Sequence, residues 1–317
     1  MTQVRNPTEH HASTTVRPPD FDAFWAEIMA TAERIPLNPT IEPSASRSSE
    51  VVDVFEIGYD SLDGVRIAGW YCVPRQIKPP FPGLLIVPGY ISEPTLPKSW
   101  AKQGYAVVGV APRGKLRSNR QYNPGYPGLL VDNIIDRNTY AYRGFYVDAT
   151  RAVDFLRSRP EVDHARIGVH GSSQGGALTL TTAALRADAI TCGAAGAPYL
   201  CGFMDAASLT HSYPYEEINE YLRLYPGREQ AVRETLNYFD GINFASLIRC
   251  PMQINLGLRD DVCPPETGFA MYDALTCPKV LHTYEGCAHD AGSYWEAANV
   301  EAFLAQHLQP AGALVRA

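Results

Sequence analysis

The segment Gly171-Ser172-Ser173-Gln174-Gly175-Gly176 decides the fold. It follows a strand-like run, residues 166–170, and precedes a helix-like run that begins at Ala177. A Gly-x-Ser-x-Gly turn between a strand and a helix holds its serine on a sharp elbow, so that Oγ projects beyond the sheet. Glycines are needed on both sides because a side chain there would collide with the neighbouring strand and helix. The motif therefore predicts that Ser173 is a nucleophile.

Around this elbow, apolar strand-like runs alternate with helix-like runs. The predicted strands are residues 84–87, 105–111, 166–170, 190–195, 252–256 and 280–284, and the predicted helices are residues 98–103, 142–158, 175–187, 265–275 and 294–307. This alternation predicts an α/β protein with a mainly parallel central sheet and helices on both faces. Two earlier runs, 51–59 and 65–73, flank Asp63-Gly64, which is a strong hairpin signal. A hairpin that leads into such a sheet, with a serine elbow after a middle strand, is the α/β-hydrolase pattern.

We expect a single α/β-hydrolase domain over residues 1–317. Residues 1–19 are polar and contain prolines, which predicts an arm that lies over the body or over a neighbouring subunit. Asp20 is suited to cap a following helix, because the apolar positions of residues 21–35 have helical spacing. Residues 199–249 interrupt the alternation and look largely helical. An insertion at this point would lie over the carboxyl ends of the strands, where the site should be.

Composition excludes several classes of function. Hydrophobic residues at 45% and charged residues at 19% are typical of an ordinary soluble globule. The net charge of −7 disfavours a nucleic-acid partner. No apolar run reaches the roughly 18 residues of a membrane span, and residues 1–16 have no apolar core of a secretory signal. The seven cysteines are dispersed and contain no C-x-x-C pair, which favours reduced cysteines in a cytoplasmic protein over disulfides or a metal site.

A serine nucleophile needs a base, and four histidines follow Ser173 in the chain. His211 lies in the predicted insertion, His282 falls inside a strand-like run, and His307 ends the last helix-like run. His289 follows the last strand, on a loop that leads into the final helix. In this scaffold the chain order is serine, acid, histidine, and the histidine stands at that position. We therefore predict that His289 is the base, the alternative being a surface loop histidine.

The acid should follow the strand at residues 252–256, where Asp260 and Asp261 are both candidates. A sharp turn after the strand, before a helix that starts with proline, favours Asp260 as the residue that orients the base. Asp261 is then left to cap the helix or to face solvent. Asp290, beside the base, is more typical of a loop or helix-capping carboxylate.

The tetrahedral intermediate of acyl transfer needs two N–H donors for its oxyanion. One should be the backbone of Gln174, directly after the nucleophile. The other should come from the loop after residues 84–87, which reads Pro88-Gly89-Tyr90-Ile91, and Tyr90 is the candidate. The alternative for this loop is a plain turn that ends the strand.

Together, these motifs resemble carbohydrate esterase family 7, the group of acetyl xylan esterases and cephalosporin C deacetylases. The resemblance covers nearly the whole chain, through residues 20–25, 113–114, 126–128, 136–143, 171–176, 238–245 and 260–265. It implies an α/β-hydrolase fold and a serine esterase that uses neither a metal nor a cofactor. It also implies the removal of acetyl groups from small acylated sugars or from cephalosporin-type alcohols. Carried over by position, the triad is Ser173, Asp260 and His289, and the oxyanion donors are Tyr90 and Gln174.

Members of this family are commonly hexamers built from two stacked trimers, so the resemblance implies a homo-oligomer, with the 199–249 segment as an interface element. No substrate-binding residue is assigned. Two other functions remain open: a carboxylesterase or thioesterase on the same scaffold, acting on a non-acetyl or biosynthetic substrate, and a hydrolase fold kept as a binding protein. The intact elbow and triad argue against the second.

The chain departs from the family pattern at three positions. The Arg-Gly-Gln motif of the family reads Arg113-Gly114-Lys115, its His-Gly-Tyr loop starts with Pro88, and its His-Glu ending reads His289-Asp290. Lys115 introduces a cation where the family has a neutral amide. One hypothesis is that residues 113–120 favour an acidic or unusual acyl ester, and the alternative is a solvated or interface loop.

Overall fold

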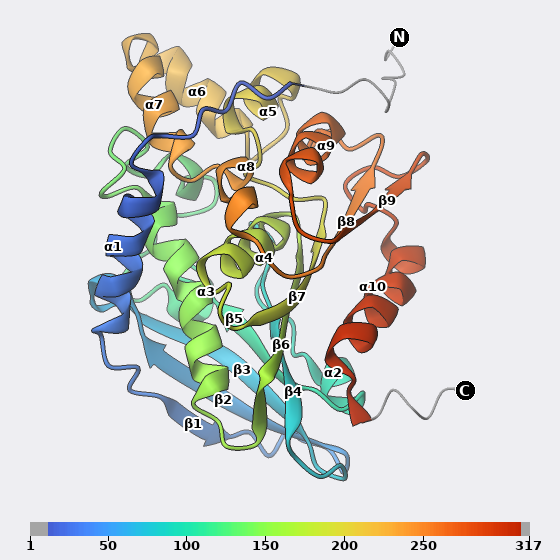
Figure 1. The fold of residues 1–317 in the computed structure, drawn as a ribbon. Helices are drawn as coiled ribbons and strands as arrows, with labels where there is room; N and C mark the ends of the chain where they lie inside the picture. The colour runs from blue at the N-terminus through green and yellow to red at the C-terminus, as the bar shows by residue number, and fades with distance from the viewer. Residues whose placement is uncertain (1–11, 312–317) are drawn as a thin grey trace.

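The computed structural model describes residues 12–311, which fold around one central sheet (Figure 1). Within this part of the chain the sheet has nine strands in the order β1-β2-β3-β5-β4-β6-β7-β8-β9. The strands are β1 Thr40–Pro43, β2 Val52–Asp60, β3 Arg66–Pro74, β4 Phe81–Ile86, β5 Ala106–Ala111, β6 Val162–Ser172, β7 Ile190–Gly196, β8 Met252–Gly257 and β9 Lys279–Tyr284. Pairing is antiparallel from β1 to β5 and parallel from β5 to β9. The predicted α/β class with a mainly parallel sheet is confirmed.

The predicted hairpin is present as β2 and β3, which pair from Val52 with Pro74 to Asp60 with Arg66. The turn contains Asp63 and Gly64, both at positive φ (60° and 72°), the backbone conformation that this dipeptide favours. Strand β1 was not predicted. It has four residues, none of them fully buried, so no apolar alternation in the sequence signals it.

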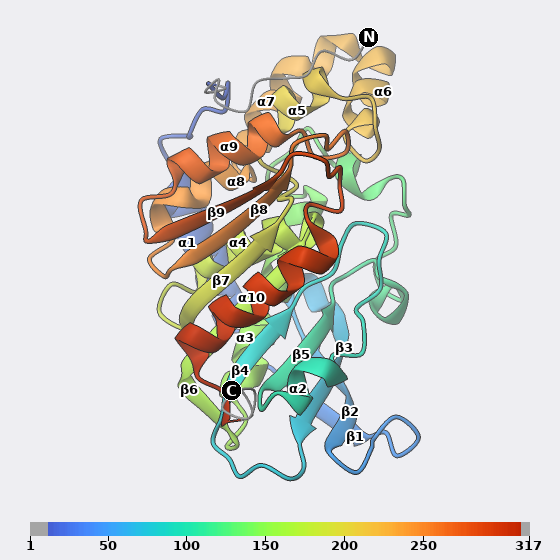
Figure 2. The same ribbon diagram turned by 90° about the vertical axis from the view of Figure 1, so that its right-hand side faces the viewer.

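Helices cover both faces of the sheet. They are α1 Phe21–Glu33, α2 Lys98–Lys102, α3 Ala141–Arg157, α4 Gln174–Leu185, α5 Phe203–Leu209, α6 Glu216–Leu224, α7 Glu229–Asn237, α8 Gly241–Phe244, α9 Pro265–Ala274 and α10 Ser293–Leu308. Figure 2 shows α2 and α10 in front of the sheet, and Figure 1 shows α1 and α3 on the opposite side. Each face of the sheet has its own cluster of buried apolar side chains. The smaller cluster lies under α2 and α10, and the larger one lies under α1, α3 and α4.

Helices α5 to α8 lie between β7 and β8, at the same end of the molecule as the carboxyl ends of the parallel strands (Figure 1). This is the segment for which the sequence predicts a helical insertion. The part of the N-terminal arm that is described runs across it. The Thr14 N–H donates to the carboxylate of Asp205, and the Thr15 hydroxyl donates to Asp240 at 2.9 Å. The rest of the predicted arm, residues 1–11, lies outside the described residues.

Asp20 stands at the N-cap of α1 as predicted, but its side chain makes no capping hydrogen bond. Its carboxylate accepts hydrogen bonds from Arg137 at 3.0 Å and from the Tyr238 hydroxyl. The capping role was wrong because these two donors hold the carboxylate away from the helix. In the described range 12–311, no helix is both long and apolar enough to cross a lipid bilayer.

Candidate active site

Ser173 occupies a strained elbow between β6 and α4. Its φ and ψ are 61° and −123°, a conformation that residues other than glycine rarely adopt. A Cβ on Gly171 or Gly175 would lie 2.6 or 2.5 Å from the carbonyl oxygen of Val87. The glycines flanking the serine therefore allow β4, β6 and α4 to meet at the elbow, as the motif predicts.

Ser173, His289 and Asp260 form one hydrogen-bonded chain. The Nε2 atom of His289 lies 3.0 Å from the Ser173 Oγ, and its Nδ1 atom lies 2.9 Å from Oδ2 of Asp260. With the proton on Nδ1 held by the carboxylate, Nε2 is free to accept the serine proton. The other oxygen of Asp260 accepts the backbone N–H groups of Val262 and Cys263 at 2.9 and 2.8 Å, which fixes this buried carboxylate.

A glycine brings the loop of the acid against the loop of the base. A Cβ on Gly257, the last residue of β8, would lie only 1.9 Å from the carbonyl oxygen of Ala288. Two residues later, the Arg259 N–H donates to the Cys287 carbonyl at 2.9 Å. Sequence reasoning missed Gly257. The available signal was a glycine that ends an apolar strand directly before the acid.

The other histidines that follow Ser173 have different partners. His211 is exposed and bonds Glu216 at 2.9 Å, and His282, on the edge strand β9, bonds Glu296 at 3.0 Å. The His307 ring packs on Phe303, with ring centres 4.7 Å apart.

The two aspartates beside the triad lie apart from the imidazole. Asp261 is exposed, and its backbone carbonyl accepts a hydrogen bond from the Thr210 hydroxyl. Asp290 accepts the Ala288 N–H at 2.9 Å within its own loop. The structure therefore places Asp260, and neither of these two, against His289.

The backbone N–H groups of Tyr90 and Gln174 donate to no residue within the described range 12–311. The loop that carries Tyr90 lies against the elbow, because a Cβ on Gly175 would be 3.4 Å from the Pro88 carbonyl oxygen. Both amides thus remain available near the nucleophile, as an oxyanion site requires.

The Tyr90 side chain is buried and holds the loop to α6. Its hydroxyl donates to Oε1 of Glu217 at 2.6 Å and accepts the Leu130 N–H at 3.1 Å. Burial and the neighbouring carboxylate raise the pKa of this phenol. The other oxygen of Glu217 accepts the Gly128 N–H at 2.9 Å, and burial raises the pKa of this carboxyl as well. This support was not visible in the sequence, because 127 residues separate Tyr90 from Glu217.

Lys115 is 1% exposed, so the predicted alternative of a solvated or interface loop is wrong for this residue. Its Nζ donates to the backbone carbonyls of Gly89, at 2.8 Å, and of Tyr90. Nζ also lies 4.6 Å from the centre of the Tyr126 ring. Burial lowers the pKa of Lys115 to about 7, and the charge of Glu93 opposes this shift.

The neighbouring cations are paired with protein groups too. Arg113 is buried against the carboxylate of Asp148, with the closest Nε to Oδ2 distance at 2.9 Å. Arg117 bonds Glu56 at 2.8 Å. Arg113, Lys115 and Arg117 are all bound to protein groups, so they give no support to the hypothesis that this stretch favours an acidic ester, whereas Arg120, the fourth cation of the stretch, is exposed.

Asp260, Cys263 and His289 are the one group among the described residues whose donor atoms, within 4.8 Å of one another, could hold a metal ion. Asp260 is already bound to His289 and to two backbone amides, and burial raises the pKa of the Cys263 thiol. A protonated thiol is a poor metal ligand, so the donor set fits a triad better than a metal centre.

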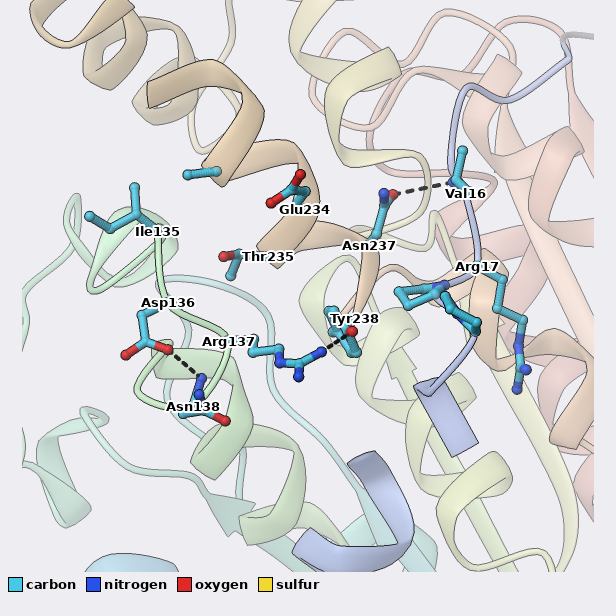
Figure 3. A pocket seen from close by; sticks show the side chains of 13 residues that line it. Val16, Arg17, Ile135, Asp136, Arg137, Asn138, Glu234, Thr235, Asn237 and Tyr238 are labelled. Carbon is cyan, nitrogen blue, oxygen red and sulfur yellow. Dashed lines mark hydrogen bonds between the residues drawn. The ribbon is translucent and has the colours of Figure 1, made fainter. Parts of the chain in front are cut away.

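A pocket of about 470 Å³ lies elsewhere, between the arm, the loop at residues 135–138 and α7 (Figure 3). None of the triad residues lines it. Its two arginines are paired within the protein, Arg17 with Asp22 and Arg137 with Asp20. Its carboxylates accept hydrogen bonds from neutral groups, Asp136 from the Asn138 N–H and Glu234 from the Gln230 amide.

The sequence and the structure of the chain were compared with those of known proteins. The profile of the acetyl xylan esterase family (AXE1) matches residues 7–307. The chain belongs to this family. The predicted resemblance is thereby confirmed, and the family indicates a carboxylic ester hydrolase.

Three relatives illustrate the match. Acetyl esterase Axe7A of Xylanibacter ruminicola is 29% identical over 280 residues, which is 84% of this chain and 62% of that protein. The chain therefore spans less than two thirds of Axe7A. The solved acetyl xylan esterase from Paenibacillus sp. R4 superposes with a TM-score of 0.88 at 32% identity, over 95% of this chain and 98% of that one. Acetyl xylan esterase 1 from Thermoanaerobacterium sp. JW/SL YS485 gives a TM-score of 0.85 at 25% identity, over 92% and 95%.

Proposed function

We propose that this protein is a serine esterase that removes acetyl groups from small acylated sugars or cephalosporin-like alcohols. The observation that carries the proposal is the His289 imidazole, which bridges Ser173 at 3.0 Å and Asp260 at 2.9 Å. The family and the acetyl esterases among its relatives support the acetyl group as the acyl part.

In the first half of the reaction, Ser173 Oγ attacks the ester carbonyl while Nε2 of His289 takes its proton. Asp260 holds the imidazole in the required tautomer and stabilises its cation. The N–H groups of Tyr90 and Gln174 bind the oxyanion, and each donor lowers the barrier by about 3 kcal/mol. The imidazolium then protonates the departing alcohol, and the acyl group stays on Ser173.

In the second half, a water molecule takes the place of the alcohol. His289 removes one proton from this water as its oxygen attacks the acyl-enzyme carbonyl, and the same two amides bind the second oxyanion. Collapse of this intermediate releases the carboxylic acid, and the proton on Nε2 returns to Ser173. His289 therefore carries out every proton transfer in both halves of the reaction.

A series of p-nitrophenyl esters with lengthening acyl chains tests the acetyl assignment. We expect kcat/KM to be highest for acetate and to fall steeply as the chain grows. A maximum at longer chains would instead support the carboxylesterase or thioesterase alternative. A panel of acetylated sugars and cephalosporin C, measured by acetate release, then identifies the alcohol part.

The proposed compartment is the cytoplasm. All seven cysteines are free, and six of them are buried, which suits a reducing environment. Alkylation of the denatured protein before and after reduction tests this, with seven thiols expected before reduction. Fewer thiols before reduction than after would contradict it.

We also propose that the protein self-associates, as the family resemblance implies. Exposed apolar side chains support this and include Ile91 and Leu116, which directly follow Tyr90 and Lys115 and are 78% and 73% exposed. Tyr294 and Trp295, at the start of α10, are 86% and 68% exposed. Light scattering coupled to gel filtration should give a multiple of 34.8 kDa, and a monomer would contradict the proposal.

A further inference from the structure

The backbone carbonyl of Gly89 receives two donors. Nζ of Lys115 lies 2.8 Å from it, and Nε2 of Gln174 lies 3.3 Å from it. The Gln174 side chain is fixed in turn, because its Oε1 accepts the Tyr142 hydroxyl at 2.7 Å. The two residues proposed to bind the oxyanion are therefore linked through one carbonyl group.

This carbonyl determines where the Tyr90 N–H points. The carbonyl of Gly89 and the N–H of Tyr90 belong to the same peptide unit, which is not among the cis peptides of the structure. In a planar trans peptide the two groups point in opposite directions. Lys115, by holding the oxygen on one side, turns the N–H to the other side, where it stays unbonded to any described residue.

The next carbonyl, that of Tyr90, is also bound by Lys115. The Lys115 Nζ thus holds two successive peptide units and restricts rotation on both sides of the Tyr90 Cα. Its hydrogen bond to the Gly89 carbonyl also polarises the Gly89–Tyr90 amide, which strengthens the Tyr90 N–H as a donor, most of all while Nζ is protonated. No carboxylate of the described residues forms an ion pair with Lys115, so these carbonyls are its main polar partners.

We infer that Lys115 is a positioning residue of the oxyanion site, which directs and strengthens the Tyr90 N–H through the Gly89 and Tyr90 carbonyls. This inference rests on the proposed esterase function. It assigns a role to a position where the chain departs from its family pattern, next to a second departure at Pro88. Lys115 touches neither the serine nor the imidazole, and it acts only through the loop.

The test compares Lys115→Met with the wild-type protein on phenyl acetate and phenyl thionoacetate. The methionine has a similar length but no donor. Sulfur is a weak hydrogen-bond acceptor, so the ratio of the two rates reports how much the oxyanion donors contribute. We expect kcat on phenyl acetate to fall on the order of 30-fold, with KM changed less than about threefold, and the oxygen-to-sulfur rate ratio to fall in parallel. Lys102→Met, an exposed lysine of α2, is the matched control and should behave as wild type.

A folded Lys115→Met protein with wild-type kcat and an unchanged rate ratio would overturn the inference and leave the esterase function intact. Should that variant fail to fold, Lys115→Gln replaces it. Its neutral amide is shorter and is expected to lower kcat about fivefold with a smaller fall of the rate ratio, and no change in either would again overturn the inference. A different result would contradict the esterase function itself. In that case the wild-type protein would neither hydrolyse phenyl acetate nor react with a fluorophosphonate at Ser173.

Discussion

The two halves of the proposed site are held in different ways. The triad half, which comprises Ser173, Asp260 and His289, stands on loops that directly follow three strands of the sheet. The oxyanion half, which comprises Tyr90, Gln174 and Lys115, depends on contacts between segments far apart in the chain, including the bond from Tyr90 to Glu217 on α6. The order of the strands in the sheet therefore largely determines where the three triad residues lie. The oxyanion loop, in contrast, takes its shape from side-chain contacts that the strand order does not determine.

The largest effect should follow from breaking the triad half at its nucleophile. Ser173→Ala removes the attacking oxygen, and turnover of p-nitrophenyl acetate should fall by about 10⁴-fold or more because the three residues act as a unit. Labelling by a fluorophosphonate should disappear with it. Retention of most of the activity would refute both the nucleophile and the proposed mechanism.

The acid offers a matched pair of neighbours. Asp260→Asn keeps the shape but loses the charge that orients and stabilises the imidazole, and kcat should fall by about 10³-fold. Asp261→Asn, one residue further on and exposed, should keep activity within about threefold of wild type. Equal losses in the two variants would mean that the hydrogen bond from His289 to Asp260 does not carry the orienting role.

This contrast also explains how much could be predicted from the sequence. Chain order and the strand-to-helix rhythm were sufficient to select Ser173, Asp260 and His289, since each follows a recognisable strand. They also predicted Tyr90 and Gln174 as donors, because these amides follow the ends of β4 and β6. The fold was predicted for the same reason, and among the strands of residues 12–311 only the short, exposed β1 left no signal.

The supports of the oxyanion half could not be predicted. Lys115 was interpreted as a residue facing substrate or solvent, because charged side chains are seldom buried without a partner. Its partners are two backbone carbonyls, which no sequence pattern records. Glu217 was one of many acidic residues in a helical segment, and only the fold shows that its carboxylate accepts the Tyr90 hydroxyl.

The oxyanion half can be weakened from its other end with Glu217→Gln. The glutamate accepts from the Tyr90 hydroxyl and the Gly128 N–H, whereas an amide has one acceptor oxygen and places a donor against the other group. We expect kcat to fall about tenfold and the free energy of unfolding to fall by about 1–2 kcal/mol. Glu220→Gln, at the exposed side of the same helix, is the control and should change the stability by less than about 0.5 kcal/mol. If Glu217→Gln changes stability but not kcat, the anchor of Tyr90 has no part in catalysis.

A pH dependence of the stability also separates the halves, since only the oxyanion half contains a buried lysine. Burial lowers the pKa of Lys115 from 10.5 to about 7 in the folded protein, against the opposing charge of Glu93, with the Tyr126 ring as the other titratable group that Lys115 contacts. Between these two pH values the unfolded chain binds the extra proton, so stability rises with pH through this window. This gain in stability is complete above pH 10.5, the pKa of Lys115 in the unfolded chain. It is lost as the pH falls through about 7, the pKa of Lys115 in the folded protein.

Urea denaturation of wild type and Lys115→Met at pH values from 6.5 to 10 measures this contribution, because titrations shared by both proteins cancel in the difference. We expect wild type to gain on the order of 3 kcal/mol over the variant between pH 7 and pH 10. The corresponding difference between wild type and Lys102→Met should stay flat, since that side chain is exposed in the folded protein. Parallel stability curves for wild type and Lys115→Met would mean that Lys115 keeps its ordinary pKa. Lys115 would then stay protonated on the two carbonyls over most of this pH range. The stability contributed by the oxyanion half would in that case not depend on pH, because backbone N–H groups do not titrate there either.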